Sequence, residues 1–170
     1  MQLDTVRAAP DRQNVRRGNL VFGRRKRTAS LVDLIGLFLD GSRAMAKELA
    51  PNASPRSARL ELYFTFGAVD AACQAEGCDS NTFSEVLDAV FSRYTGRPSF
   101  EGRLQSSREF SELLFDQGDR SPTLRAVVEL GAHAIRDFVT REGELPLGRL
   151  SLLLGQSDDL LSKIDRELTR

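Results

Sequence analysis

The segment 56–77, RSARLELYFTFGAVDAACQAEG, most constrains what this chain can fold into. Only four residues between positions 60 and 75 are polar, namely Glu61, Thr65, Asp70 and Gln74. A helix that is apolar nearly all the way round is normally buried on several sides. We therefore expect residues 56–77 to form the central helix of an all-α domain. Its Gly67-Ala68 pair removes side-chain bulk at mid-helix, where another helix could cross closely.

The length and composition of the chain fit one soluble globular domain. Its 170 residues are enough to bury a hydrophobic core without metals or disulfides. The hydrophobic fraction of 41% and the charged fraction of 28% are ordinary for such a protein. Among the 24 basic residues only Lys26, Lys47 and Lys163 are lysines, a bias typical of GC-rich bacterial genomes.

Apolar residues at helical spacing predict a first helix from Ser30 to Leu49. Ser30 is expected to be its N-cap, and Pro51 follows its end. With the segments that come later, this pattern predicts six or seven helices between residues 30 and 170. The expected fold is a single compact multi-helix domain built around the central apolar helix.

Two later helices have clear start signals. Thr82 and Glu85 stand at the spacing of a capping box, which predicts a helix over residues 83–94. Proline is tolerated at the first position of a helix, so Ser121-Pro122 predicts another helix start.

The remaining helix boundaries are less constrained. Residues 99–116 form one helix, or two shorter helices if Ser106 and Glu109 make a second capping box. Gly118 is expected to stop this segment, and Ser157 is expected to cap the last helix.

The Gly-Ala pair of the central helix recurs 64 residues later as Gly131-Ala132, again inside a long apolar helix. Such an echo arises from a duplicated helical hairpin or by coincidence in a helix-rich chain. Because no side chains beyond the glycines match well, the pattern favours coincidence.

The zero net charge of the chain conceals an uneven distribution. Residues 1–30 contain eight basic and two acidic residues, a net charge of +6, and residues 31–170 contain 16 basic and 22 acidic residues, a net charge of −6. We expect residues 1–29 to be a flexible basic N-terminal arm ahead of an all-helical domain at 30–170. The candidate contacts for an anionic partner are Arg24, Arg25, Lys26 and Arg27. A solvated tail, or an arm that folds back on the acidic body, explains the cluster equally well.

The sequence holds no group of residues typical of an enzyme. Its only histidine, His133, falls on the polar face of a predicted helix, where a general base lacks shelter. A structural ion pair or simple exposure explains Asp70 better than a catalytic role does. Cys73 and Cys78 lack the further Cys or His ligands that a zinc site needs, and Cys73 is expected to act as a small apolar residue. We therefore expect a non-catalytic protein without metal or cofactor.

The same features predict a cytoplasmic protein. Two cysteines make no disulfide framework, so a reducing compartment fits best. The longest early apolar run, residues 31–39, is interrupted by Asp33 and is far shorter than the about 20 residues that span a bilayer.

Three functional hypotheses remain. The leading one is a non-catalytic, adaptor-like interaction or regulatory protein that presents a helical surface to a protein partner. This partner is another protein or a second copy of the same chain. The second is a nucleic-acid-associated protein that uses the basic arm for non-specific phosphate contacts. The third is a small-ligand-binding helical domain with a cavity beside Tyr63, Phe64 and Phe66.

Overall fold

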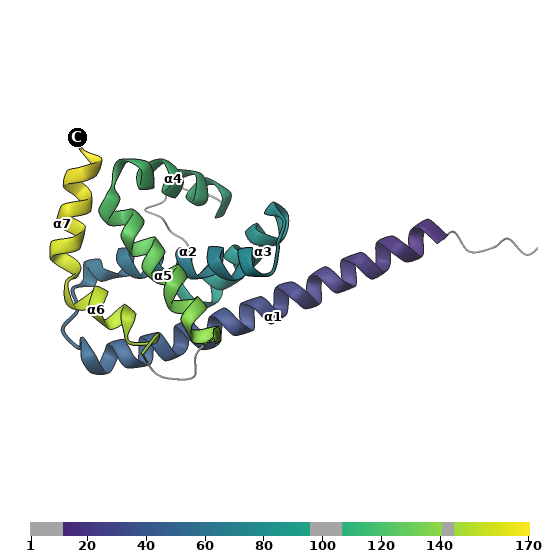
Figure 1. Cartoon of the computed structure of the whole chain (residues 1–170), viewed down its shortest axis with the longest axis horizontal. Coiled ribbons are helices and arrows are strands. Elements are labelled where there is room, and N and C mark those ends of the chain that lie inside the picture. Colours follow the sequence, from purple (N-terminus) through teal and green to yellow (C-terminus); the bar gives the residue numbers. More distant parts are fainter. Residues whose placement is uncertain (1–11, 96–106, 141–144) are drawn as a thin grey trace, which may run out of the picture.

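The chain is helical, without a strand, over the residues that the structure describes. This computed structural model describes residues 12–95, 107–140 and 145–170, with nearly all side chains from residue 26 onward. Its helices are α1 (Arg12–Leu49), α2 (Ala58–Ala75), α3 (Ser80–Val90), α4 (Ser107–Arg120), α5 (Pro122–Thr140), α6 (Arg149–Gly155) and α7 (Ser157–Leu168) (Figure 1). A 3-10 turn (Pro55–Ser57) precedes α2, and a π-helical turn (Phe91–Thr95) follows α3. The predicted all-α fold with six or seven helices is confirmed.

Helix α2 lies at the centre of the body, as predicted. Eleven of its 18 residues are buried, and α1, α3, α5 and α6 all contact it. Aromatic side chains fill the space around it: the rings of Phe38 and Phe64 stack with centroids 5.9 Å apart. The ring of Phe66 meets Phe83 and Phe110 edge to face, at 6.0 and 5.8 Å. The nearly continuous apolar sequence of α2 is therefore explained by neighbours on several sides.

Helices α2 and α5 cross at very short backbone distance. A Cβ on Gly67 would lie 1.9 Å from the carbonyl oxygen of Val128, and a Cβ on Gly131 would lie 2.0 Å from that of Phe64. Each glycine thus faces the carbonyl of the residue three positions before the other glycine. The close crossing expected at Gly67 is confirmed. The same packing requirement on both helices accounts for the repeated Gly-Ala pair without a duplicated hairpin.

Helix α1 begins at Arg12, and so the prediction that Ser30 caps it is wrong. Ser30 lies inside the helix, which continues to Leu49 as expected. Arginine has a high helix propensity, and no proline stands between Pro10 and Pro51. Gly18 and other glycines weaken such a helix by about 1 kcal/mol each without breaking it. That residues 1–29 move independently of the body stays a prediction.

Helix α3 starts earlier than the capping box indicated. Its N-cap is Asp79, whose carboxylate accepts a hydrogen bond from the Thr82 amide at 2.7 Å. Thr82 is therefore inside the helix, and its predicted role as N-cap is wrong. Aspartate is as strong an N-cap as threonine. The sequence therefore offered two possible N-caps for α3, Asp79 and Thr82, within one helical turn.

Two further boundary predictions are corrected. Helix α4 passes through Gly118 and ends at Arg120, because a single glycine lowers helix propensity without breaking a helix. Helix α7 has Gln156 at the N-cap position, and Ser157 is its first residue. The structure shows α4 starting at Ser107, and the preceding part of the predicted 99–116 segment lies outside the described residues.

Helix α5 begins at Pro122, as predicted, and its first turn holds the end of α7. Ser121 Oγ accepts a hydrogen bond from the Leu124 amide at 3.1 Å and donates one to Glu167 Oε2 at 2.6 Å. The amide and the hydroxyl of Thr123 donate to the same carboxylate at 3.1 and 2.8 Å. These bonds, that of Ser121 above all, hold the pKa of Glu167 below its usual value.

We expect Gly67→Ala and Gly131→Ala each to destabilise the protein by about 1–3 kcal/mol or more, the usual cost of forcing atoms into a packed core. The added methyl group meets a backbone carbonyl that has no rotamer to escape into. Gly118→Ala is the matched control, since nothing lies within 4 Å of its added Cβ. It should stabilise α4 by about 0.5–1 kcal/mol. Urea unfolding measures all three, and a Gly67→Ala variant as stable as the wild type contradicts the close crossing.

Glu167→Gln is expected to lower stability at neutral pH but not in acid. A carboxyl group with a lowered folded-state pKa contributes stability above its unfolded pKa of about 4.3, and this contribution is lost as the pH falls through the folded pKa. Urea unfolding of wild type and variant at pH 7 and below pH 4 measures the difference. Glu48→Gln, on the exposed side of α1, is the control. An equal deficit at both pH values would show that ionisation of Glu167 is not what stabilises the contact.

Candidate functional site

The basic part of α1 is the strongest candidate for contact with a partner. Residues 12–30, which we name the basic extension, contain seven basic and no acidic residues. Its backbone projects away from the other helices (Figure 1), and Leu31 is the first side chain of α1 described as buried. Of the four predicted contacts, Lys26 and Arg27 are exposed, and the side chains of Arg24 and Arg25 lie outside the described ones.

Two exposed ion pairs connect α1 to neighbouring segments near the extension. Arg27 lies 3.6 Å from the carboxylate of Glu76 at the end of α2, with about half of each side chain exposed. Arg93 of the π-helical turn lies 3.3 Å from Asp33. Exposed pairs of this kind contribute at most about 1 kcal/mol. Arg27 can therefore exchange Glu76 for another carboxylate at little cost.

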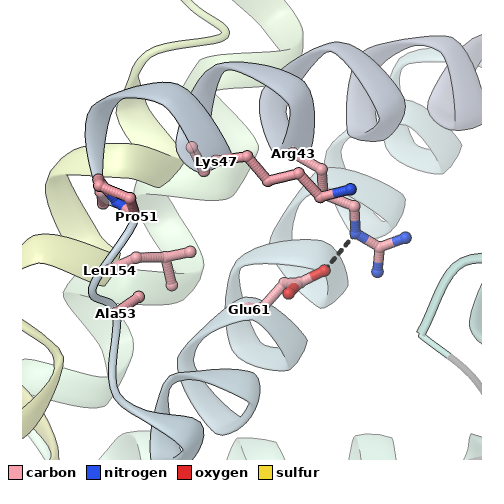
Figure 2. Close-up of a pocket in the computed structure, with 8 residues that line it drawn as sticks. Arg43, Lys47, Pro51, Ala53, Glu61 and Leu154 are labelled. Carbon is pink, nitrogen blue, oxygen red and sulfur yellow. Dashed lines mark hydrogen bonds and ion pairs between the residues drawn. The ribbon is translucent and has the colours of Figure 1, made fainter.

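A pocket of about 440 Å³ lies where α1 ends and α2 begins (Figure 2). Its lining residues are Arg43, Ala46, Lys47, Ala50, Pro51, Ala53, Glu61 and Leu154. An ion pair between Arg43 and Glu61 crosses one end, and Figure 2 shows the Lys47 side chain extending toward Arg43. The volume is within the range of small-molecule sites. These eight residues include no hydroxyl, thiol or imidazole, and their charged groups are those of Arg43, Lys47 and Glu61.

The residues beside which a cavity was expected are buried in the core. Tyr63, Phe64 and Phe66 are 5%, 0% and 2% exposed, and both phenylalanine rings contact other rings. The described pocket lies elsewhere, beside Arg43 and Glu61. Sequence analysis missed it because its lining comes from the end of one helix, the start of another and α6.

A second cluster that sequence analysis missed links α2 to α7. Arg59 donates hydrogen bonds to the hydroxyl of Tyr63 and to the carboxylate of Asp165, both at 2.7 Å. Arg56 donates to the same carboxylate at 3.1 Å. Burial opposes the charge on Arg59, but its bonds to Tyr63 and Asp165 outweigh that effect and raise its pKa. The four-residue spacing from Arg59 to Tyr63, which places both on one face of a helix, was visible in the sequence. Nothing in the sequence around Asp165 indicates that it pairs with Arg59.

Asp70 and His133, the two residues considered for a catalytic role, lie on α2 and α5. Asp70 is half-buried, and burial raises the pKa of its carboxyl group, opposed by a hydrogen bond from Gln74 at 2.7 Å and by the charge of Arg136. Asp70 thus accepts a hydrogen bond from Gln74, one turn later in α2. Arg59, on the same helix, forms its ion pair with Asp165. His133 is exposed on α5, as predicted.

Metal-binding clusters and membrane-spanning helices are not found in the described part of the chain. Within it, no three or more His, Cys, Asp or Glu side chains gather closely enough to hold a metal ion. None of its helices combines the length and the apolar character needed to cross a membrane.

Amide protons of residues 12–25 are expected to exchange much faster than those of residues 31–49 in the same helix. A short helical segment without tertiary packing is only marginally stable in water, whereas residues from Leu31 onward are held by the core. Hydrogen exchange followed by mass spectrometry measures both segments in one experiment, with α5 as an internal reference. Equal protection along the whole of α1 would mean that the extension is docked.

No protein-family model, curated protein or solved structure matches this chain. Function is therefore inferred from the molecule's own features. These are the projecting basic extension, the pocket beside Arg43 and Glu61, and the polar clusters at the helix ends.

Proposed function

We propose that this is a non-catalytic interaction protein whose basic extension binds an acidic surface of a protein partner in the cytoplasm. The observation that carries the proposal is the helical backbone of residues 12–30 projecting from the body with seven basic and no acidic residues (Figure 1). A helical segment that lies outside the hydrophobic core does not contribute to the packing of that core. Its length and charge are explained by contact with another molecule.

The exposed face of α1 supports a protein partner. Lys26 is exposed on the extension, and Leu37, eleven residues later, is 65% exposed on the same helix. Eleven residues correspond to about three turns, so both positions fall on one side of α1. A partner lying along this side meets cationic and apolar side chains together, a combination typical of protein interfaces.

The charge of the body makes nucleic acid the weaker alternative. Residues 31–170 carry a net charge of −6, which repels a phosphate backbone that approaches the body. The cluster at 24–27 has no interleaved aromatic residue for base stacking other than Phe22. An acidic protein that docks on the extension alone avoids this repulsion. A second copy of the chain, with its own acidic body, fits the same description.

The test compares the full chain with a variant that carries Arg24→Gln, Arg25→Gln, Lys26→Gln and Arg27→Gln. Glutamine keeps the helix propensity and removes four charges. The control variant removes the same charge from the body through Lys47→Gln, Lys163→Gln, Arg166→Gln and Arg170→Gln. Tagged proteins are cross-linked in nuclease-treated native lysate, and mass spectrometry identifies the captured proteins and their cross-linked positions.

We expect a protein that cross-links to α1 in the wild type and the control variant, and whose capture falls at least about tenfold in the extension variant, equivalent to about 1.4 kcal/mol. Equal capture by all three contradicts the proposal. Capture that occurs only in a parallel lysate without nuclease, with salt-sensitive binding of duplex DNA by the purified protein, would favour the nucleic-acid alternative. Salt-sensitive dimers in sedimentation that only the extension variant lacks would identify the partner as a second copy.

A further inference from the structure

The end of α2 brings the two cysteines of the chain together. Gly77 has a φ of +60°, a conformation that favours glycine, and it reverses the direction of the backbone. The Gly77 amide donates a hydrogen bond to the carbonyl of Gln74 at 3.1 Å, and the Cys78 amide donates one to that of Cys73 at 2.9 Å. This pair of bonds is a Schellman motif.

The motif brings the two cysteine side chains close together. In a Schellman motif, the side chains of the two residues joined by the longer-range bond commonly touch. Here those residues are Cys73 and Cys78, and the Cys78 side chain is close enough to raise the pKa of the Cys73 thiol. Both are free; Cys73 is 3% exposed and Cys78 is partly exposed. The turn thus holds one buried and one accessible thiol against each other.

The two thiols differ in burial. Burial raises the pKa of Cys73 to about 12, with further contributions from Cys78 and from the charge of Asp70. At neutral pH the Cys73 thiol therefore stays protonated, and its burial keeps it from an oxidant in solution, so it loses its proton only when a neighbouring group accepts that proton. An oxidant reaches Cys78 first, and the Cys73 sulfur is already beside it.

We propose that Cys73 and Cys78 are a redox modification site, which forms a reversible intramolecular disulfide when the protein meets a peroxide. Two apolar residues at positions 73 and 78 would pack against each other and stabilise the same turn equally well. A pair of thiols adds a chemistry that such residues lack. The site is independent of the proposed partner-binding role of the basic extension.

The reaction balances with hydrogen peroxide as the oxidant. The Cys78 sulfur attacks one peroxide oxygen, the O–O bond breaks, and one water leaves, so Cys78 becomes a sulfenic acid. The Cys73 sulfur then attacks the Cys78 sulfur, the S–O bond breaks, and the departing hydroxyl group takes the Cys73 proton as a second water. Two thiols lose two electrons and two protons in total, and the peroxide is reduced to two waters. A small-molecule thiol reverses the bond by exchange.

The bond would form where three helices meet. Glu76, between the two cysteines, pairs with Arg27 of α1, and Asp79, directly after Cys78, is the N-cap of α3. Oxidation therefore locks the turn that connects α2 to α3, beside the base of the basic extension.

The test treats the folded, full-length protein with hydrogen peroxide, then unfolds it in N-ethylmaleimide and digests it with trypsin. Both cysteines fall in one tryptic peptide, residues 60–93. We expect this peptide to lose two hydrogen atoms and to carry no maleimide, and to regain two alkylatable thiols after dithiothreitol. A peptide that still carries two maleimides, or a sulfinic acid on Cys78 beside an alkylated Cys73, overturns the proposal.

Single variants test the order of the two steps. In Cys78→Ala, which changes a loop residue, Cys73 should stay reduced under peroxide and take one maleimide after unfolding. In Cys73→Ala, Cys78 should form a sulfenic acid that dimedone traps. Oxidation of Cys73 in the first variant contradicts the proposed order, and it remains measurable even if the second variant folds poorly.

Two further comparisons distinguish a disulfide that the folded turn favours from non-specific oxidation of the two cysteines. In urea, where the turn is lost, the same peroxide treatment should form the disulfide more slowly than in the folded protein. An equal or faster rate in urea overturns the role of the turn. In glutathione mixtures the folded pair should be oxidised by excess glutathione disulfide and reduced by excess glutathione. A pair that stays reduced in glutathione disulfide alone also overturns the proposal.

Discussion

The structure depends on the close approach of two helix backbones, those of α2 and α5. The carbonyl oxygen of Val128 occupies the place where a side chain at Gly67 would begin, and the carbonyl of Phe64 does the same at Gly131. Such proximity allows Cα–H···O=C contacts and many dispersion contacts that a wider crossing would lose. The other helices are arranged around this pair: α1 and α3 contact α2, α4 and α7 contact α5, and α6 contacts both. Each of these helices thus packs against at least one member of the α2–α5 pair.

The features to which we assign a function lie at the edges of this core. The basic extension precedes Leu31, the first side chain of α1 described as buried, and its described cations, Lys26 and Arg27, are exposed. The two thiols sit just past the last turn of α2, where Gly77 turns the chain toward α3. Arg27 and Glu76 connect these two places by an exposed ion pair. The two places to which we assign a function therefore lie next to each other at the edge of the core.

Local signals in the sequence predicted the fold class and the central helix. A stretch as apolar as residues 60–75 has to be buried on several sides, and Gly67 within it predicted a close crossing. Ser121-Pro122 predicted the start of α5, because proline fits only the first turn of a helix. Charge asymmetry singled out the cluster at residues 24–27, since net charge depends on composition alone. The contact between Cys73 and Cys78 was not anticipated, because it follows from the backbone conformation of Gly77.

The sequence by itself therefore determined an all-helical body around one apolar helix, and only the tertiary structure decided which residues meet. Propensity and capping act within a few residues of the chain, so they could not show that Gly131 faces Gly67. They also could not show that Asp165 reaches Arg59 across 106 positions, or that Arg43 and Glu61 close one end of a pocket. Such pairings depend on the path of the whole chain, because they are set by which helices lie side by side after every segment has found a place in the core.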